Sequence, residues 1–209
     1  NIPASGIICT HIPGSNPSED FRTEGGELIP IRANVEEARR LLAEAGYPNG
    51  EGFPEVTYKY SSSSGRKVLP EVLQGMWKTA LGVKVNLANE EWKVFLSTRR
   101  KGDFDMAEAA WAMDFPDASN FLETLTSDSQ NNDSGYSNPE FDSLIKKAQV
   151  EPDRVNRINY LHEAEKILVN DMPLAPLYFY SAAVMKSQRV KGIYHSPNGI
   201  VYFRGTDID

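Results

Sequence analysis

The sequence predicts an α/β fold, because segments with helical periodicity alternate with short segments rich in β-branched and aromatic residues. The links between these segments are short, which favours a sheet whose strands are joined by crossover helices. The 209 residues are 40% hydrophobic and 24% charged, as in an ordinary globular protein. This length allows one large α/β domain or two small subdomains that share a sheet.

The first 33 residues do not follow this alternation. Proline and glycine recur irregularly, at Pro3, Pro13, Gly14, Pro17, Gly25, Gly26 and Pro30. We therefore expect residues 1–33 to form an extended or looping lead-in, not a packed element, that continues from a missing part of a larger protein. A single α/β unit is expected over residues 34–209.

The first helix has clear start and stop signals. Asn34 can cap its N-terminus, with Glu37 three residues later, and apolar residues from Val35 onward share one face. Gly46, followed by Pro48, supplies the stop.

Two further pairs of strand and helix follow. Residues 56–60 predict a strand, and a wide apolar stripe predicts a helix over residues 68–81. Residues 83–87 alternate as the next strand. Asn89 is expected to cap the next helix, which Gly102 ends.

Residues 103–111 predict a third strand, although their pattern is uneven. Glu108 shares a face with the apolar Phe104 and Met106. A strand covered on both faces would be more uniformly apolar. Glu108 therefore lies near an edge of the sheet or faces a ligand cleft.

The remainder of the chain adds helices and short strands. The polar residues 127–137 predict a loop, and the dipeptide Asn138-Pro139 starts a helix with proline at its first position. A longer helix is expected from about Asp153, with one buried face. Residues 174–180 and 182–185 indicate one or two further strands.

The charge balance excludes several classes of partner. A net charge of −7 argues against nucleic acid, because phosphate binding needs a concentrated basic face. The dense basic cluster Arg99-Arg100-Lys101 lies at an expected helix end, where it complements the helix dipole. No apolar stretch approaches the ~20 residues that a membrane-spanning helix needs. The first residues have no basic n-region and no apolar h-region, so we expect no signal peptide in this span.

The residues that usually carry catalysis or metal binding lack the required patterns. A single cysteine, Cys9, cannot form an internal disulfide, and His11, His162 and His195 lack the short spacings of a metal site. No nucleophile elbow, phosphate loop, dinucleotide fingerprint or zinc-protease helix is present. We therefore expect no cofactor, no metal and no catalytic residue. A glycosidase-type pair of carboxylates stays undecided, because a sequence gives no distances.

Asp114 follows the expected third strand directly, with Trp111 three residues before it. In open α/β sheets, ligands bind beyond the carboxyl ends of strands. The local sequence before Phe115-Pro116 favours a turn-forming or capping aspartate, and Trp111 is the kind of residue that more often packs in a core. The alternative is a carboxylate that an organic cation, such as a ligand ammonium group, would pair with.

The serine run 61–64 and Gly65 lie between a strand and a helix N-terminus, where hydroxyls and free amides favour an anion. Arg66 falls in the first turn of that helix and opposes its dipole. The simpler interpretation is a solvated side chain, and the alternative is an arginine that binds a carboxylate.

Several ordered motifs between about Asn34 and Tyr180 resemble those of the oligopeptide-binding proteins of ABC importers. They include Glu91-Trp92-Lys93-x-Phe95-Leu96, Thr98-Arg99, Gly102-x-Phe104-Asp105, Trp111-x-x-Asp114, and Asn131-Asn132 with Tyr136-Ser137-Asn138-Pro139. The first helix with Gly46-Tyr47-Pro48, and Leu81-Gly82-Val83-Lys84-Val85, are also typical of that family. The chain is on this basis identified as a member.

The resemblance implies a lobe of the type II periplasmic-binding-protein fold, a mixed β-sheet flanked by helices. It also implies that this chain is the second peptide-binding lobe of a protein more than twice as long, whose two lobes close on the ligand. Asp114 resembles the acid that pairs with the α-ammonium group of a peptide, and Trp111 resembles an aromatic wall of the cleft. Trp92 belongs to the same set of ligand-binding candidates.

Two further assignments follow from the resemblance. Arg66 and Arg99 fall where some relatives place groups that reach a peptide's C-terminal carboxylate. Glu108 stands where certain relatives have an arginine for short peptides, which puts any preference for peptide length in doubt.

The implied function is binding of short peptides outside the cytoplasm, in the periplasm or as a cell-surface lipoprotein, and delivery to an ABC transporter permease. The implied partners are the peptide, the permease and the missing first lobe, with membrane attachment only through an anchor outside this span. The alternatives are the same fold binding a non-peptide solute (a nickel complex or a sugar), a peptide-sensing signalling receptor and, more remotely, a hydrolase that uses Asp114.

Overall fold

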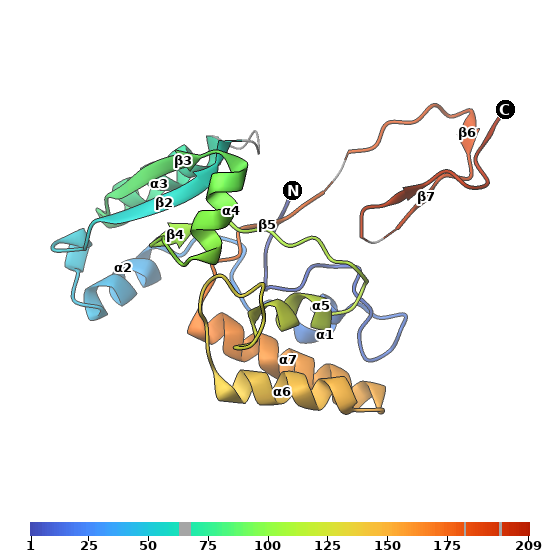
Figure 1. The fold of residues 1–209 in the computed structure, drawn as a ribbon, viewed down its shortest axis with the longest axis horizontal. Coiled ribbons are helices and arrows are strands. Elements are labelled where there is room, and N and C mark those ends of the chain that lie inside the picture. The colour runs from blue at the N-terminus through green and yellow to red at the C-terminus, as the bar shows by residue number, and fades with distance from the viewer. Residues whose placement is uncertain (63–67, 182, 197) are drawn as a thin grey trace. The chain divides into compact units, whose positions relative to one another are not determined.

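The chain forms two compact units in the computed structural model, which describes residues 1–62, 68–181, 183–196 and 198–209. Unit 1 combines Asn1–Ile31 with Trp111–Asp209, and unit 2 is the continuous segment Arg32–Ala110 (Figure 1). The break at residues 31/32 lies close to the expected end of the lead-in at residue 33. Residues 111–209, however, group with the lead-in and not with the segment that precedes them.

The helices of unit 2 are α2 (Val35–Glu44), the 3-10 turn η1 (Pro48–Gly50), α3 (Val68–Leu81) and α4 (Trp92–Arg100). The expected cap of α2 is confirmed, because the Asn34 side chain accepts a hydrogen bond from the Glu37 N–H at 3.1 Å. The expected cap of α4 is wrong. Asn89 still belongs to the preceding strand, and the Glu91 carboxylate caps the helix by accepting the Lys93 N–H at 2.8 Å. A carboxylate at this position also complements the helix dipole.

Unit 2 is built on a parallel sheet, as the alternation of strands and helices predicts. Its strands are β2 (Val56–Ser61), β3 (Val85–Glu90) and β4 (Met106–Ala107), in the order β3-β2-β4. Tyr58 at the centre pairs with Leu87 of β3 and Met106 of β4. The buried residues Tyr58, Val83 and Val85 form the core, against which Leu73, Trp77 and Leu81 of α3 pack.

The third strand is much shorter than expected, with two residues in place of the span 103–111. Just before β4, hydrogen bonds from side chains take the place of the backbone hydrogen bonds of the expected longer strand. The Asp105 carboxylate accepts the Thr57 N–H at 2.9 Å, and the Lys59 ammonium group donates to the Asp103 carbonyl oxygen at 2.5 Å. Because β4 is an edge strand, a charged residue near it is tolerated.

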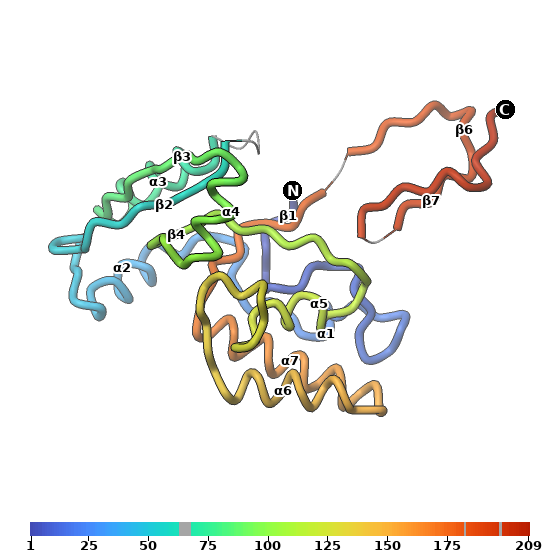
Figure 2. Tube along the Cα trace, viewed as in Figure 1, coloured from blue at the N-terminus to red at the C-terminus, as the bar shows by residue number. Residues whose placement is uncertain are grey.

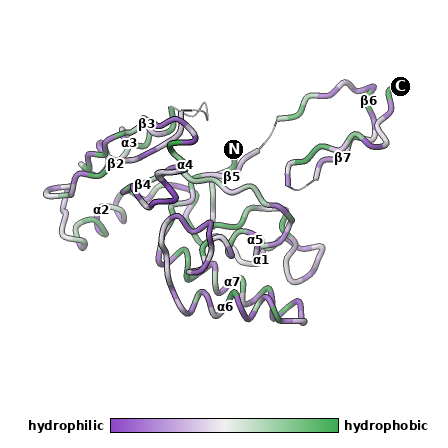
Figure 3. The backbone as a smooth tube through the Cα atoms, in the orientation of Figure 1, coloured by the Kyte–Doolittle hydropathy of each residue, from purple (hydrophilic) through white to green (hydrophobic). Residues whose placement is uncertain are grey.

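The helices of unit 1 are α1 (Phe21–Gly25), α5 (Ser119–Leu122), the 3-10 turn η3 (Glu123–Leu125), α6 (Pro139–Val150) and α7 (Arg154–Asp171). The start signals of the two long helices are confirmed: Asn138 caps α6, which begins with Pro139, and Asp153 caps α7. These two helices lie side by side (Figure 2). Polar and apolar residues alternate along both, as in helices that bury one face (Figure 3).

The lead-in is a packed part of unit 1, which corrects the expectation of a loose segment. The side chains of Ile8, Ile12 and Phe21 are fully buried with those of Phe141 and Leu161 from the long helices. Glu165 of α7 accepts hydrogen bonds from the backbone N–H groups of Ile7 and Ile8 at 2.8 and 2.9 Å. The apolar residues of the lead-in have no regular spacing, so periodicity could not reveal that they are buried.

The other strands of unit 1 form two-residue antiparallel pairs. They are β1 (Ile2–Pro3) with β5 (Tyr178–Phe179), β6 (Val190–Lys191) with β9 (Asp207–Ile208), and β7 (Tyr194–His195) with β8 (Val201–Tyr202). The strand expected over residues 174–180 is thus reduced to Tyr178–Phe179. Of the strand expected over residues 182–185, residue 182 lies outside the described residues, and residues 183–185 are not in a strand.

Candidate functional site

Trp111 and Asp114 are joined in unit 1 by one buried side chain, that of Asn120. The Asn120 Oδ1 atom accepts a hydrogen bond from the Trp111 indole Nε1–H at 3.1 Å and another from the Asp114 backbone N–H at 3.0 Å. Asn120 is 8% exposed and is the second residue of α5. The tryptophan and the aspartate are therefore tied to the same helix.

The Asp114 carboxylate faces solvent. The contacts that hold this residue use its backbone: the N–H donates to Asn120, and the carbonyl oxygen accepts from Asn198 Nδ2 at 3.5 Å. Among the described residues, no hydrogen bond or ion pair is assigned to the carboxylate itself. Trp111 beside it is 40% exposed. The result is an available anion next to an open aromatic face, which is an arrangement that suits an organic cation.

The turn between Asp114 and α5 is fixed by a second carboxylate, that of Asp117. Arg157 of α7 donates two hydrogen bonds to it, at 2.8 and 2.9 Å, and the Ser119 N–H donates a third at 2.9 Å. Burial acts to raise the pKa of Asp117, but the hydrogen bonds from Arg157 and Ser119 outweigh it and hold the pKa below its ordinary value. Asp117 thus stays charged and serves as an anchor, unlike Asp114.

The helix that carries Asn120 is itself held in the core of unit 1. Ala118 and Leu122, on either side of Asn120, are fully buried among residues of α6 and α7. A site whose supporting residues are packed in a core keeps its geometry better than one on a free loop. Asp114 is in an exposed turn, but the helix that supports it is packed in the core.

Arg99 and Glu108 lie together in unit 2, as neighbours of β4. The Arg99 guanidinium donates from Nη1 to the Glu108 carbonyl oxygen at 3.4 Å, and its Cζ atom lies 5.8 Å from the centre of the Phe95 ring. The Glu108 carboxylate accepts the Ser61 N–H at 3.4 Å, and its own N–H donates to Lys59. Both side chains are half-buried. Glu108 follows the edge strand β4 directly, which agrees with the expectation that it lies near an edge of the sheet.

Trp92 begins α4 and packs at 6.2 Å, centre to centre, against the Phe95 ring, with 45% of its surface exposed. Arg66, together with the anion site suggested by the serine run, lies outside the described residues apart from Ser61 and Ser62. Ser62 donates its hydroxyl to the Glu90 carbonyl oxygen at 3.2 Å.

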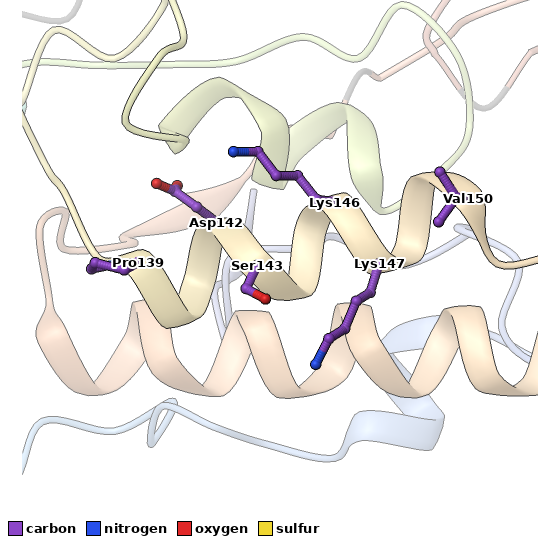
Figure 4. A pocket seen from close by; sticks show the side chains of 6 residues that line it. All are labelled: Pro139, Asp142, Ser143, Lys146, Lys147 and Val150. Atoms are coloured by element: carbon purple, nitrogen blue, oxygen red, sulfur yellow. The ribbon is translucent and has the colours of Figure 1, made fainter.

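A shallow hollow follows the surface of α6, and its lining includes none of the predicted site residues (Figure 4). Its lining comes from one helix: Pro139, Asp142, Ser143, Lys146, Lys147 and Val150. Lys147 points toward α7, where its ammonium group lies 5.8 Å from the centre of the Tyr160 ring. A hollow lined by a single exposed helix face lacks the convergent walls of a ligand site, and we assign it no function.

Two other features, a metal site and a membrane-spanning helix, are not found among the described residues. No group of three or more histidine, cysteine, aspartate or glutamate side chains is placed to hold a metal ion. Within the same part of the chain, no helix is both long and apolar enough to cross a membrane.

Asn120 and Arg157 are the functional residues that sequence reasoning missed. Asp117 with Ser119 two residues later is a recognisable turn signal, because an aspartate side chain commonly accepts the N–H two residues on. The partner from α7, Arg157, is 40 residues from Asp117 in the sequence, and Asn120 of α5 is a polar residue that no local pattern marks as buried.

Comparison with known proteins places these residues in a family context. A model of the family described as bacterial extracellular solute-binding proteins, family 5 Middle, matches residues 1–133. The dipeptide-binding protein DppE of Bacillus subtilis is 36% identical over 191 residues, which cover 90% of this chain and 35% of that protein. The oligopeptide-binding protein OppA of the same organism is 34% identical over 204 residues, covering 97% and 37%.

The solved structures agree with the sequence relatives. That of the Escherichia coli murein tripeptide binding protein MppA matches with a TM-score of 0.79 at 29% identity, covering 99% of this chain and 40% of that one. The chain therefore spans between a third and two-fifths of the length of these proteins.

Proposed function

Because the chain belongs to the bacterial extracellular solute-binding proteins of family 5, we propose that it is one lobe of a peptide-binding protein. That protein works outside the cytoplasm and delivers short peptides to the permease of an ABC importer. The observation that carries the proposal is the exposed Asp114 carboxylate, presented beside Trp111 on a rigid support. The relatives named as dipeptide- and oligopeptide-binding proteins support the choice of peptide as solute.

The proposed chemistry is recognition without reaction. The Asp114 carboxylate pairs with the α-ammonium group of the peptide, and this charge-assisted bond is strong once the second lobe excludes water. The Trp111 face shields one side of the ion pair and interacts with the cation. Because every free peptide has an α-ammonium group, such a site gives affinity that does not depend on the side chains.

The remaining candidates have secondary roles in this proposal. Trp92, with nearly half of its surface exposed, offers an apolar contact. The Arg99 guanidinium, which donates to the Glu108 carbonyl oxygen, is a cation that can attract a peptide carboxylate. The Glu108 carboxylate is an anion that repels carboxylates nearby. Arg66 is retained as a cation for a peptide carboxylate. We propose that the first lobe and a membrane anchor belong to other parts of the full-length protein.

The test is titration calorimetry of the full-length protein that contains this chain, first with a pool of short peptides and then with the same peptides N-acetylated. Asp114→Asn, which removes the charge and preserves the shape, is expected to weaken binding of free peptides. A lost hydrogen bond between charged groups contributes about 1.5–3 kcal/mol, which corresponds to roughly 10- to 100-fold in affinity. Acetylation should have an effect of similar size in the wild-type protein and little further effect in the variant.

Asp128→Asn is the matched control, because it removes an exposed carboxylate from unit 1 without touching the Asp114 turn. It should bind free peptides as the wild type does. If acetylation and Asp114→Asn both leave the affinity unchanged, the role proposed for Asp114 is wrong. Binding of a nickel complex or a sugar, with none of the peptides bound, would reject the peptide itself.

A further inference from the structure

We infer that Asn120 is a positioning residue for ligand binding, which couples the Trp111 indole to the Asp114 turn so that the ring and the carboxylate are presented together. The inference rests on the proposed function, because it concerns how the ammonium site is held. Asn120 does not itself reach the ligand in this scheme. It acts through two hydrogen bonds to the residues that do.

The first step is the sharing of one oxygen atom between two donors. Oδ1 of Asn120 accepts from the Trp111 side chain at 3.1 Å and from the Asp114 backbone at 3.0 Å. An amide oxygen has two lone pairs, so this atom is saturated by the two contacts. Trp111 and Asp114 are separated by only two residues, and the shared acceptor closes them into a loop around the Asn120 side chain.

The second step is the chemical choice of residue. The Trp111 and Asp114 N–H groups share a hydrogen-bond acceptor that is buried, because Asn120 is 8% exposed. An asparagine oxygen accepts both bonds without a charge. A leucine of similar shape would leave both N–H groups without this partner. An aspartate would keep the acceptor but add a negative charge beside Asp114. Asparagine therefore leaves Asp114 as the anion of the turn that a cationic ligand meets.

The third step is the support of Asn120 itself. Ser119, the preceding residue, donates its N–H to Asp117, and Asp117 is held by two hydrogen bonds from Arg157. The neighbouring Ala118 and Leu122 are fully buried. Position is thus transmitted from α7 through Asp117 to α5, and from Asn120 of α5 to Trp111 and Asp114.

The consequence for binding is specific. Without Asn120, the indole can rotate away and the Asp114 carboxylate samples more orientations, while the net charge of the site is unchanged. Affinity for the ammonium group should fall because more disorder must be lost on binding. We expect Asn120→Leu to bind free peptides about 5- to 10-fold more weakly, as for the loss of one or two neutral hydrogen bonds.

The experiment is a double-mutant cycle in the full-length protein, with calorimetry on the same free and N-acetylated peptides. The single variants are Asn120→Leu and Trp111→Phe, which removes the indole N–H together with part of the aromatic surface, and the double variant combines them. If Asn120 acts through Trp111, Asn120→Leu is expected to have a smaller effect in the Trp111→Phe background.

A second measurement follows the indole directly and needs no ligand. Hydrogen exchange of the Trp111 Nε1–H, observed by NMR of tryptophan-labelled protein, should accelerate in Asn120→Leu and return toward the wild-type rate in Asn120→Asp. The indole groups of Trp77 and Trp92, both in unit 2, are internal references against global unfolding, and unchanged exchange of the backbone amides of α6 and α7 excludes unfolding of unit 1.

The outcomes separate the two claims. If acetylation does not weaken binding to the wild-type protein, the proposed function fails and the inference falls with it. If the wild type discriminates but Asn120→Leu binds and discriminates as the wild type does, the inference alone is wrong. Additive effects in the cycle, or an unchanged exchange rate for the Trp111 indole, would also overturn it.

Discussion

The two units of this chain are built in opposite ways. Unit 2 is continuous in sequence, with a parallel sheet in which strands that are successive in sequence are linked through helices. Its buried cluster has three members among the described residues, all on or near two strands. Unit 1 joins two segments that are separated by residues 32–110, and its buried cluster has fourteen described members drawn from the lead-in, the region of α5 and η3, α6 and α7.

The difference matters because the Asp114 turn belongs to unit 1. Both contacts that fix the turn, from Asn120 and from Arg157, come from helices anchored in the larger core. Under the proposed function, the Asp114 carboxylate must keep its position although no partner among the described residues holds it, and a well-packed support favours that. The comparison therefore predicts that disturbance of the unit 1 core affects the candidate site, whereas disturbance of unit 2 leaves it intact.

The largest effect should come from the buried ion pair of unit 1. Glu165 is fully buried and accepts hydrogen bonds from Arg22, at 2.5 Å, and from two backbone N–H groups of the lead-in. Glu165→Ala leaves a buried guanidinium without its counter-charge, which destabilises by about 3–5 kcal/mol. Urea unfolding should show this loss, and hydrogen exchange should assign it to unit 1.

The matched control replaces both charges, as in Arg22→Met with Glu165→Leu. The double variant should regain the part of the stability that is lost through the uncompensated guanidinium, but the Ile7 and Ile8 N–H groups stay without their acceptor, so the recovery should be partial. A single Glu165→Ala variant as stable as the wild type would mean that the lead-in is not held by this pair.

The same contrast explains which parts of the fold the sequence could predict. Helix α2 begins after Asn34 and α6 after Asn138, because capping is a local interaction that a few neighbouring residues determine. The length of β4 could not be predicted, since it depends on the Asp105 side chain taking the place of a ladder bond to a strand 48 residues away. Local rules were sufficient for much of unit 2 and for the long helices of unit 1.

The candidate site divides along the same line. Asp114 and Trp111 were predicted from a family motif and from their place at the end of an expected strand, but that strand ends at Ala107, so Asp114 does not follow it directly. Asn120 was not predicted, because a polar residue on a short helix gives no sign that it will be buried. Phe21 and Ile8 were assigned to a loose segment for the same reason: their burial depends on α7, which follows more than 130 residues later.

A moderately large effect is expected from truncations in the two cores. Leu161→Ala, at a fully buried position of α7, should destabilise unit 1 by about 2–5 kcal/mol through lost burial and a cavity. Val85→Ala in β3 removes two carbons, at about 0.8 kcal/mol each, from unit 2. Exchange rates of backbone amides, measured unit by unit, will show where each loss falls.

These two variants also test the coupling of core and site. Leu161→Ala should accelerate exchange of the Trp111 indole N–H, since α7 supports α5 through Asp117 and Arg157. Val85→Ala should leave that rate unchanged. Equal acceleration by both variants would contradict the idea that the site depends on unit 1 alone.

The smallest predicted effect is a pH dependence centred on His162 of α7. Its ring stacks on Phe21 at 3.9 Å between centres, and its Nε2 lies 3.6 Å from the Glu24 carboxylate. Burial lowers the pKa of His162 more than the facing Glu24 and Glu165 raise it, and Arg22 adds to the lowering. The imidazole is therefore neutral in the folded protein at pH values where the unfolded chain already binds a proton.

The sign of the effect follows from this difference in proton binding. Where the unfolded state binds more protons, stability rises with pH. Stability should thus fall as the pH drops below the ordinary pKa of histidine, about 6.5, and the loss should level off below the folded pKa. His162→Gln should flatten this part of the profile, while His195→Gln, at an exposed position, should not change it. A profile with the same slope in His162→Gln would place the titrating group elsewhere, outside the contact between α1 and α7.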